Sequence, residues 1–317
     1  MKKQTIAIFA LVIAQVFWGA SYLLSDRALQ VFSPAFLVTL RISIAAIVLG
    51  IIGVTTGRIQ KVKLKDLKFF ALAAFVEPFV YFLCEAKALD SGVSPTVTSV
   101  MISLIPLLTP VFAYIVLREK VTLTNFLGII VSIVGVLMII LEKDGEMSVS
   151  MVGFVLLFIA ILASISYTLV LRKIPEHYNT LTIVFYNFCI SLCFFIPTSL
   201  IMEWNAISSL QINKETIDAF YAIIALALSA SCVAFLFFSF GVRIIGPNRA
   251  NVFNNIPPGV TAILSIFVLN EMMPAIKWVG LGIVIIGMFI SQINITKVNR
   301  RIDIRKYKKY KKSLSNK

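Results

Sequence analysis

Long apolar blocks alternate with short polar segments along almost the whole chain. Ten such blocks fall near residues 4–25, 34–53, 68–88, 95–117, 125–142, 150–171, 179–201, 218–240, 250–269 and 275–295. Each block is about 20 residues long, which lets a helix cross roughly 30 Å of hydrocarbon. The pattern predicts an all-α integral membrane protein with ten transmembrane helices.

Composition agrees with this class. Of the 317 residues, 59% are hydrophobic, and the mean hydropathy is +0.94. Soluble domains are roughly 45–50% apolar, so this excess does not fit one soluble core. The four cysteines lie inside apolar runs without the spacing of metal ligands, and we expect no disulfide, metal or other cofactor.

Basic residues are distributed unevenly between the two sides of such a bundle. With the N-terminus in the cytoplasm, ten Lys and Arg residues lie in the tail beyond Thr296, and most others lie in cytoplasmic loops. Basic residues are enriched in cytoplasmic loops, so we predict that both termini are cytoplasmic in a bacterial inner membrane. The net charge of +14 then indicates a tail attracted to anionic lipid rather than to nucleic acid.

An internal repeat divides the chain. Residues 94–140 align with residues 246–292 at a constant offset of 152, without a gap. Five crossings per copy is an odd number, so the copies are predicted to be inverted, as 1–143 and 144–296, followed by the tail 297–317. Inverted repeats around a midplane site are a recurring architecture of transporters. A duplication kept in a protein with another role is the alternative. The clearest matches pair Pro95, Pro106, Thr109, Glu119, Gly128 and Gly135 with Pro247, Pro258, Thr261, Glu271, Gly280 and Gly287.

Three segments carry a resemblance to a known family. They are FWGASYLLS at residues 17–25, SLIPLLTPVFAYIVLREKVTLTNFLGIIVSIVGVLMI from residue 103, and ILSIFVLNEMMPAIKWVGLGIVIIGMFI from residue 263. The sequence resembles the drug/metabolite transporter superfamily, in particular its ten-helix exporters with two EamA-type domains. The resemblance implies export of amino acids, other small metabolites, nucleotide sugars or drugs, by antiport or proton coupling. The second half has Ala163 and Ser164 in place of the Trp-Gly pair of the first helix.

Charged residues inside apolar blocks are the main candidates for function. The stretch FVEPFVYFLCEAKAL, residues 75–89, carries Glu77, Tyr81 and Glu85 at helical spacing on one face. Arg41 lies at a similar depth in the preceding block, and buried charges should pair or face a watery cavity. We expect Arg41 to pair with one glutamate, either as a structural clamp or at the site. The second carboxylate is then free to couple proton entry to solute exit or to pair with a solute ammonium group. Pro78 loosens the turn beside Glu77.

Polar residues in both repeats are candidates for lining the cavity. The segment NRANVFNNIPPGVTAIL, residues 248–264, places Asn251, Asn254 and Asn255 on one side of a helix. Prolines at corresponding positions of two halves indicate a midplane site, whereas hydrogen bonding between helices is the alternative. An offset of 145 pairs Tyr22 with Tyr167. The full set of predicted substrate-binding residues is Trp18, Ser21, Tyr22, Tyr81, Ser99, Ser103, Tyr167, Asn187, Asn251 and Asn255.

No catalytic constellation is visible in the sequence. The one histidine, His177, lies in a loop, and there is no metalloprotease or phosphate-binding motif. Glu119 and Glu271 close two matching helices at opposite faces, and we interpret them as packing residues. The expected function is secondary-active export of a small polar metabolite, such as an amino acid, by alternating access. The alternatives are an uptake permease for a cationic or zwitterionic solute, and a membrane enzyme or lipid-handling protein. We expect a monomer, with a dimer as the alternative.

Overall fold

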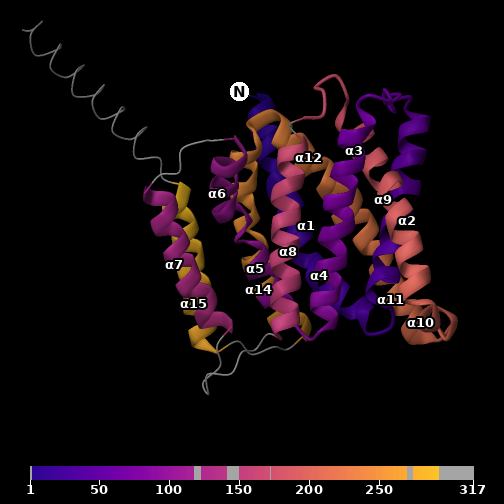
Figure 1. Ribbon diagram of the computed structural model, residues 1–317. Helices are drawn as coiled ribbons and strands as arrows, with labels where there is room; N and C mark the ends of the chain where they lie inside the picture. Colours follow the sequence, from indigo (N-terminus) through magenta and orange to yellow (C-terminus); the bar gives the residue numbers. More distant parts are fainter. Residues whose placement is uncertain (1, 118–122, 141–149, 172, 270–273, 293–317) are drawn as a thin grey trace, which may run out of the picture.

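The computed structural model describes residues 2–117, 123–140, 150–171, 173–269 and 274–292, and within these ranges it contains helices and no strand. The first half forms α1 (Lys2–Leu29), α2 (Pro34–Thr55), α3 (Leu67–Ala74), η1 (Phe75–Val80), α4 (Tyr81–Asp90), α5 (Pro95–Ile102), α6 (Ile105–Leu117) and α7 (Leu123–Ile140). The second half forms α8 (Met151–Leu171), α9 (Thr180–Met202), α10 (Trp204–Ser208), α11 (Lys214–Ala225), η2 (Leu226–Val233), α12 (Ala234–Ile245), α13 (Pro247–Ala250), η3 (Asn251–Asn255), α14 (Pro257–Leu269) and α15 (Ala275–Gln292). The helices stand side by side in one bundle (Figure 1).

Seven helical segments are long and apolar enough to cross a membrane, so the chain is a multi-pass membrane protein. They are Lys3–Leu29, Pro34–Thr55, Leu67–Asp90, Met151–Leu171, Thr180–Met202, Lys214–Ile245 and Asn251–Val268. Three more apolar helices, Pro95–Thr109, Phe126–Ile139 and Ala275–Gly287, are shorter. The all-α membrane class is therefore confirmed. The count of ten crossings and the cytoplasmic placement of both ends stay predictions.

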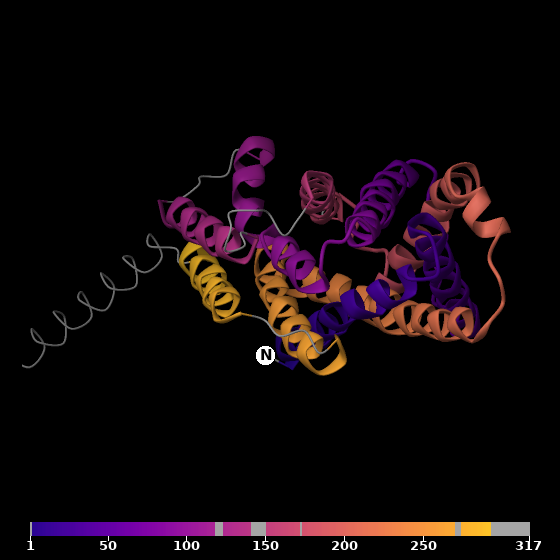
Figure 2. The same ribbon diagram turned by 90° about the horizontal axis from the view of Figure 1, so that it is seen from below.

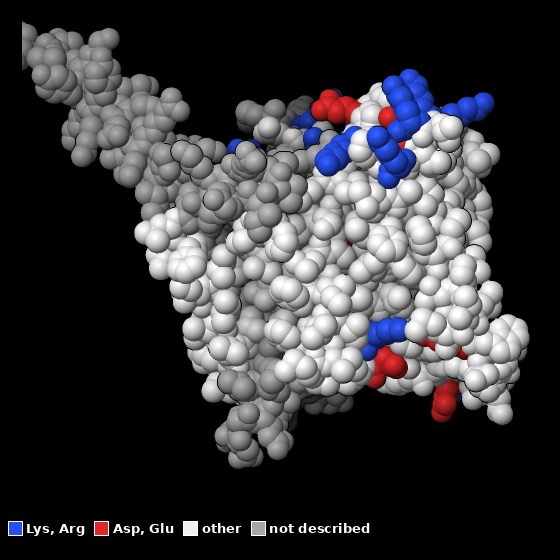
Figure 3. All heavy atoms as spheres, viewed as in Figure 1, with Lys and Arg blue, Asp and Glu red and all other residues white. Residues whose placement is uncertain are grey.

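Charge is concentrated at the ends of the bundle. Figure 3 shows Lys and Arg gathered at one end and a broad uncharged band below them. Two loops meet at this basic end, since the Gln60 side chain donates to the carbonyl of His177 at 2.9 Å and accepts from the N–H of Asn179 at 2.6 Å. An uncharged band is what the bilayer core requires of a lipid-facing surface.

Helices are interrupted at matching places in the two halves. The third helical segment of each half contains a wider turn, η1 in the first and η2 in the second. The fourth is broken between Ile102 and Ile105 in the first half, and by the tight turn η3 in the second. Interrupted helices free main-chain groups for binding, and in transporters they mark the solute site. The matching prolines that indicate a midplane site, Pro106 and Pro258, lie beside these two breaks. The wider turn at η2 contains no proline and was not predicted.

Helix packing is reciprocal between the halves. In the repeat alignment α8 is the counterpart of α1, and α4 is the counterpart of α12. The helix α1 packs against α12 and α14, and its counterpart α8 packs against α4 and α6. In the same way α2 contacts η2, and α9 contacts η1. Reciprocal contacts of this kind arise when two similar units are related by a twofold axis.

The helices α7 and α15 lie side by side at the left edge of the bundle in both views (Figures 1 and 2). Their contacts place the twofold axis between them. A Cβ atom on Gly135 would lie 2.6 Å from the carbonyl oxygen of Gly280, and one on Gly287 would lie 2.8 Å from that of Gly128. The second contact is the repeat counterpart of the first, because Gly135 corresponds to Gly287 and Gly128 corresponds to Gly280. Between them Ser132 donates to the carbonyl of Val284 at 3.2 Å, and these two residues are each other's counterparts. Glycine allows the two backbones to approach this closely.

On the side of the bundle away from α7 and α15, Glu203 of the second half caps the start of α2. Both carboxylate oxygens of Glu203 accept hydrogen bonds at the first turn of α2: Oε1 from the N–H of Ala35 at 3.0 Å, and Oε2 from the N–H of Phe36 at 2.8 Å. The Ser33 hydroxyl also donates to Glu203, at 2.6 Å. The first N–H groups of a helix have no partner within the helix, and a carboxylate there is favourable.

Candidate functional site

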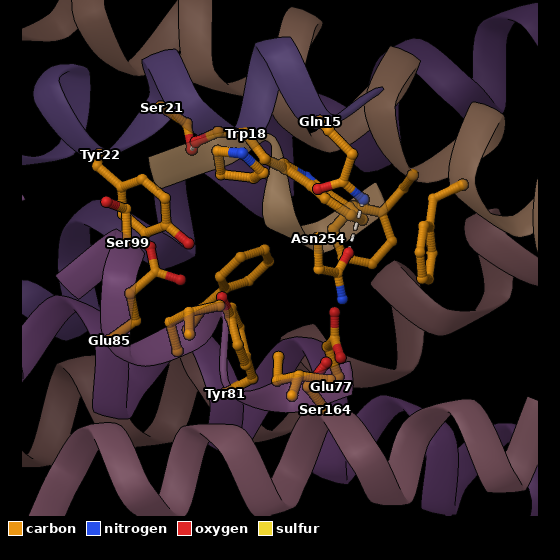
Figure 4. A pocket seen from close by; sticks show the side chains of 16 residues that line it. Gln15, Trp18, Ser21, Tyr22, Glu77, Tyr81, Glu85, Ser99, Ser164 and Asn254 are labelled. Atoms are coloured by element: carbon orange, nitrogen blue, oxygen red, sulfur yellow. Dashed lines mark hydrogen bonds between the residues drawn. The ribbon is translucent and has the colours of Figure 1, made fainter. Parts of the chain in front are cut away.

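A cavity lies among helices of both halves, between α1, the η1–α4 segment, α5, α8, α12 and the start of α14 (Figure 4). Its volume is ≈ 40 Å³, which is room for a few water molecules. A metabolite therefore requires the walls to move apart. The lining residues are Gln15, Trp18, Ser21, Tyr22, Glu77, Tyr81, Phe82, Glu85, Ser99, Ile102, Ile105, Ser164, Phe235, Phe238, Asn254 and Pro257.

Glu77 reaches the cavity from the break in its helix. Its backbone has φ −148° and ψ 117°, and the peptide bond to Pro78 is cis. Proline removes a main-chain donor and prevents a regular turn there. The carbonyl of Glu77 instead accepts a hydrogen bond of 3.0 Å from the Asn187 side chain on α9. The carboxylate is 5% exposed, and its Oε2 atom has no hydrogen-bond partner.

Two amides and a hydroxyl face Glu77 from other helices. Gln15 donates its side-chain N–H to Oδ1 of Asn254 at 2.6 Å, which turns the amide nitrogen of Asn254 toward the Glu77 carboxylate (Figure 4). Ser164 on α8 lies beside the same carboxylate in the close-up. This side of the cavity thus offers donors and acceptors from η3, α1 and α8 around one acid.

Glu85 occupies the other side of the cavity. It is 4% exposed and lies near Tyr22 and Ser99 in the close-up, with Tyr81 between the two acids (Figure 4). Glu77 and Glu85 thus line one cavity in spite of the break between them.

Arg41 does not form the predicted ion pair with either glutamate. Its Nε atom donates to the Ser231 hydroxyl in η2 at 2.8 Å, and its guanidinium carbon lies 4.2 Å from the centre of the Phe82 ring. Arg41 is 2% exposed and is not among the residues that line the cavity. Its charge still acts on Glu85 through space. The guanidinium binds η2 because the wider turn places the Ser231 hydroxyl within hydrogen-bond distance.

Aromatic side chains form one wall of the cavity. Trp18 packs edge-on against Phe235 at 5.5 Å between ring centres, and against Phe238 at 5.0 Å. The indole N–H donates to the carbonyl of Ala230 in η2 at 3.0 Å. Beside Trp18, a Cβ on Gly19 would lie 2.7 Å from Val260 of α14, so the glycine allows α1 to approach that helix. The wall is therefore fixed to both halves.

Several residues predicted to bind substrate do line the cavity, and others do not. Trp18, Ser21, Tyr22, Tyr81 and Ser99 line it; their role in binding stays a prediction. The lining does not include Ser103, Tyr167, Asn187, Asn251 and Asn255. Ser103 donates to Val100 in its own helix, and Asn187 holds the Glu77 carbonyl. Glu119 and Glu271 lie outside the described residues.

Of the three asparagines, Asn254 lines the cavity. Residues Asn251–Asn255 form a tight helix with three residues per turn. Asn255 therefore lies a third of a turn away from Asn254, and Asn251 lies one turn away. Sequence reasoning also missed Gln15, although it is a polar residue three positions before Trp18 on the same helix face.

Comparisons with known proteins agree with this architecture. The pattern of the EamA-like transporter family matches residues 5–141 and 151–292. The transporter YyaM of Bacillus subtilis is 26% identical over 293 residues, covering 90% of this chain and 94% of its own. A transporter of Archaeoglobus fulgidus is 28% identical over 286 residues, covering 88% and 96%. Both are named only as uncharacterized transporters. A solved crystal structure that is 15% identical superposes with a TM-score of 0.66 over 95% of this chain and 98% of that one, which shows the fold.

Proposed function

Because this chain belongs to the EamA-like transporter family, we propose that it moves a small polar solute across the bacterial inner membrane by alternating access, with Glu77 exchanging a proton for the solute. The observation that carries the proposal is a buried carboxylate with an unpartnered oxygen, in a cavity between two reciprocally packed halves. A carboxylate in such a place requires a proton or a cation.

Alternating access is supported by the way the halves meet. The cavity is lined by both halves, and interrupted helices of both halves reach it at η1, at the α5–α6 break and at η3. Two similar units that exchange conformations open such a cavity first to one side and then to the other. Its volume of ≈ 40 Å³ corresponds to a closed state between the two open ones.

Proton coupling is supported by the environment of Glu77. Coupling has two conditions: proton and solute occupy this carboxylate in turn, and the cavity switches from one side of the membrane to the other only when one of them is bound. A proton gradient then drives the solute in the opposite direction. Export follows when protons enter the cell through the same site.

The test uses purified protein in sealed vesicles that contain a pH-sensitive dye. A panel of amino acids, nucleosides and amines is added outside, and proton movement that depends on both solute and protein is recorded. Chromatography of the recovered solute separates transport, which leaves it unchanged, from an enzyme, which converts it. The Glu77→Gln variant should abolish the signal, whereas Glu215→Gln, an exposed acid on α11, should retain it. Intact proton-driven flux in a folded Glu77→Gln variant would refute the role of Glu77, and intact flux in Glu85→Gln as well would refute coupling through either acid.

A further inference from the structure

The charged side chains that line the cavity are both acidic. Among its lining residues are two carboxylates, Glu77 and Glu85, and no lysine, arginine or histidine. The nearest buried cation, Arg41, is bonded to Ser231 and lies against the ring of Phe82. A solute carboxylate that entered this space would meet two like charges and no basic side chain, at a high electrostatic cost in a poorly hydrated site.

Helix starts do not supply the missing positive charge. A helix start can bind an anion through its free main-chain N–H groups. Here α14 begins with Pro257 and Pro258, and neither has an N–H group. The start of α6 has Pro106 at its second position. The two helix starts that border the cavity are therefore depleted in donors for an anionic group.

The two acids differ in how their charge is compensated. The charge of Arg41 acts on Glu85. No lysine, arginine or histidine is among the residues that line the cavity beside Glu77, which faces Ser164 and the like charge of Glu85. Its Oε2 atom is buried without a partner. Glu77 is thus the place where an external positive charge is missing.

The aromatic lining of the cavity suits an apolar body that carries a positive charge. Trp18, Phe82, Phe235 and Phe238 present aromatic rings to the cavity. Aromatic faces attract ammonium groups, most strongly where water is excluded. Rings also pack against the apolar part of a solute.

From this charge and ring arrangement we infer that the substrate class is organic amines that are cationic and lack a carboxylate, with the ammonium group on Glu77 and the apolar body against the Trp18 wall. The inference rests on the proposed transport function and narrows it. It replaces the amino acid expected from the sequence, whose carboxylate would have no basic partner in the cavity. Glu85 together with Arg41 then has a positioning role.

Amine and proton compete for one carboxylate. Bound amine keeps Glu77 ionised, and a proton that binds Glu77 releases the amine. Amine binding should therefore weaken as the pH falls. The titratable groups that interact with Glu77 or border its side of the cavity are Tyr22 of α1, Tyr81 and Glu85 of α4, and Tyr167 of α8. Arg41 of α2 acts on Glu85.

The test compares three solutes that share one ring: 2-phenylethylamine, phenylalanine and 3-phenylpropionate. Binding to the purified protein is measured by calorimetry at several pH values, and counterflow is measured in vesicles. We expect binding of the amine alone, weakened about tenfold or more in Glu77→Gln, the loss typical for removing one partner of a charged hydrogen bond. Glu215→Gln should bind as the unchanged protein does. Thermal unfolding of each variant reports whether it is folded.

Each outcome bears on one of the two proposals. Binding of phenylalanine or phenylpropionate but not of the amine overturns the inference and leaves transport standing. Absence of amine binding across a set of aryl and alkyl amines also overturns it. Unchanged amine affinity in a folded Glu77→Gln variant overturns the assignment of the ammonium site. Amine binding that depends on Glu77, without counterflow of any amine, supports the inference and counts against transport.

Discussion

The side-chain amide of Asn187 donates a hydrogen bond of 3.0 Å to the main-chain oxygen of Glu77. Asn187 belongs to α9 of the second half, and Glu77 belongs to the broken helix of the first. The bond satisfies the main-chain group at the residue whose backbone leaves the helical conformation. The position of the Glu77 carboxylate is therefore tied to the position of the other half.

Replacing Asn187 by leucine keeps the volume and removes the donor. The buried carbonyl of Glu77 then has no partner, and we expect the free energy of unfolding to fall by about 1–3 kcal/mol. Solute-dependent proton flux should fall as well, because Glu77 is no longer held. Unfolding in mixed detergent micelles measures the first effect. The control is Asn205→Leu in the exposed α10; equal losses in both variants would contradict the role of the bond.

The contact between α7 and α15 can be tested with one methyl group. Gly135→Ala places a Cβ atom 2.6 Å from the carbonyl of Gly280, so the helices must separate. Overpacking of this kind costs about 1–3 kcal/mol of stability. Gly282→Ala on α15 is the matched control, because nothing lies within 4 Å of its added Cβ. Midpoints of thermal unfolding in detergent should drop for the first variant and hold for the second.

The carboxylate that caps α2 should matter more than other exposed acids. Glu203→Ala removes three hydrogen bonds from the start of α2, and loss of a helix cap costs about 0.5–2 kcal/mol. Glu203→Gln keeps one acceptor oxygen and should lose less. Glu176→Ala, in the loop at the basic end, serves as the control. A ranking in which glutamine is no better than alanine would show that the cap is not the source of the effect.

Arg41 and Glu85 should be coupled in stability although they form no direct ion pair. Arg41→Met leaves Glu85 without the cation that acts on it, and removing one member of a buried charge pair is strongly destabilising, by about 3–5 kcal/mol for pairs in contact. The separation here predicts a smaller loss. Adding Glu85→Gln should recover part of it, so that the two effects are not additive. Additive losses in the double variant would show that the charges act independently.

Composition and periodicity were sufficient to predict the class of the protein, because the length and apolar content of each block decide whether it can cross a bilayer. The interruption at Glu77–Pro78 and the acids Glu77 and Glu85 at the cavity could also be read from residue types. Proline removes a main-chain donor and clashes with the preceding turn of a helix, and a charged side chain in lipid must face a partner or a cavity inside the protein. These inferences depend on neighbours in the chain.

Other features depend on contacts between distant segments. The partner of Arg41 is Ser231, 190 residues away, in a wider turn that no proline marks. Asn254 lines the cavity from a turn with three residues rather than 3.6. The sequence shows Ser164 where the first half has the glycine of its Trp-Gly pair. Its position beside Glu77 could not be predicted, because it depends on the packing of α8 against η1.

The meeting of Ser132 with Val284 limits how the two copies of the duplicated unit can diverge. Elsewhere each copy faces different neighbours, so a residue can drift without reference to its twin. On the axis each residue contacts its own repeat counterpart. At the moment of duplication the two counterparts were the same amino acid. The present serine–valine contact, in which the hydroxyl bonds to a carbonyl across the axis, is therefore a place where the ancestral symmetry has already been lost. Restoring identical residues there, as Ser132→Val or Val284→Ser, would show how far the fold still tolerates its older form.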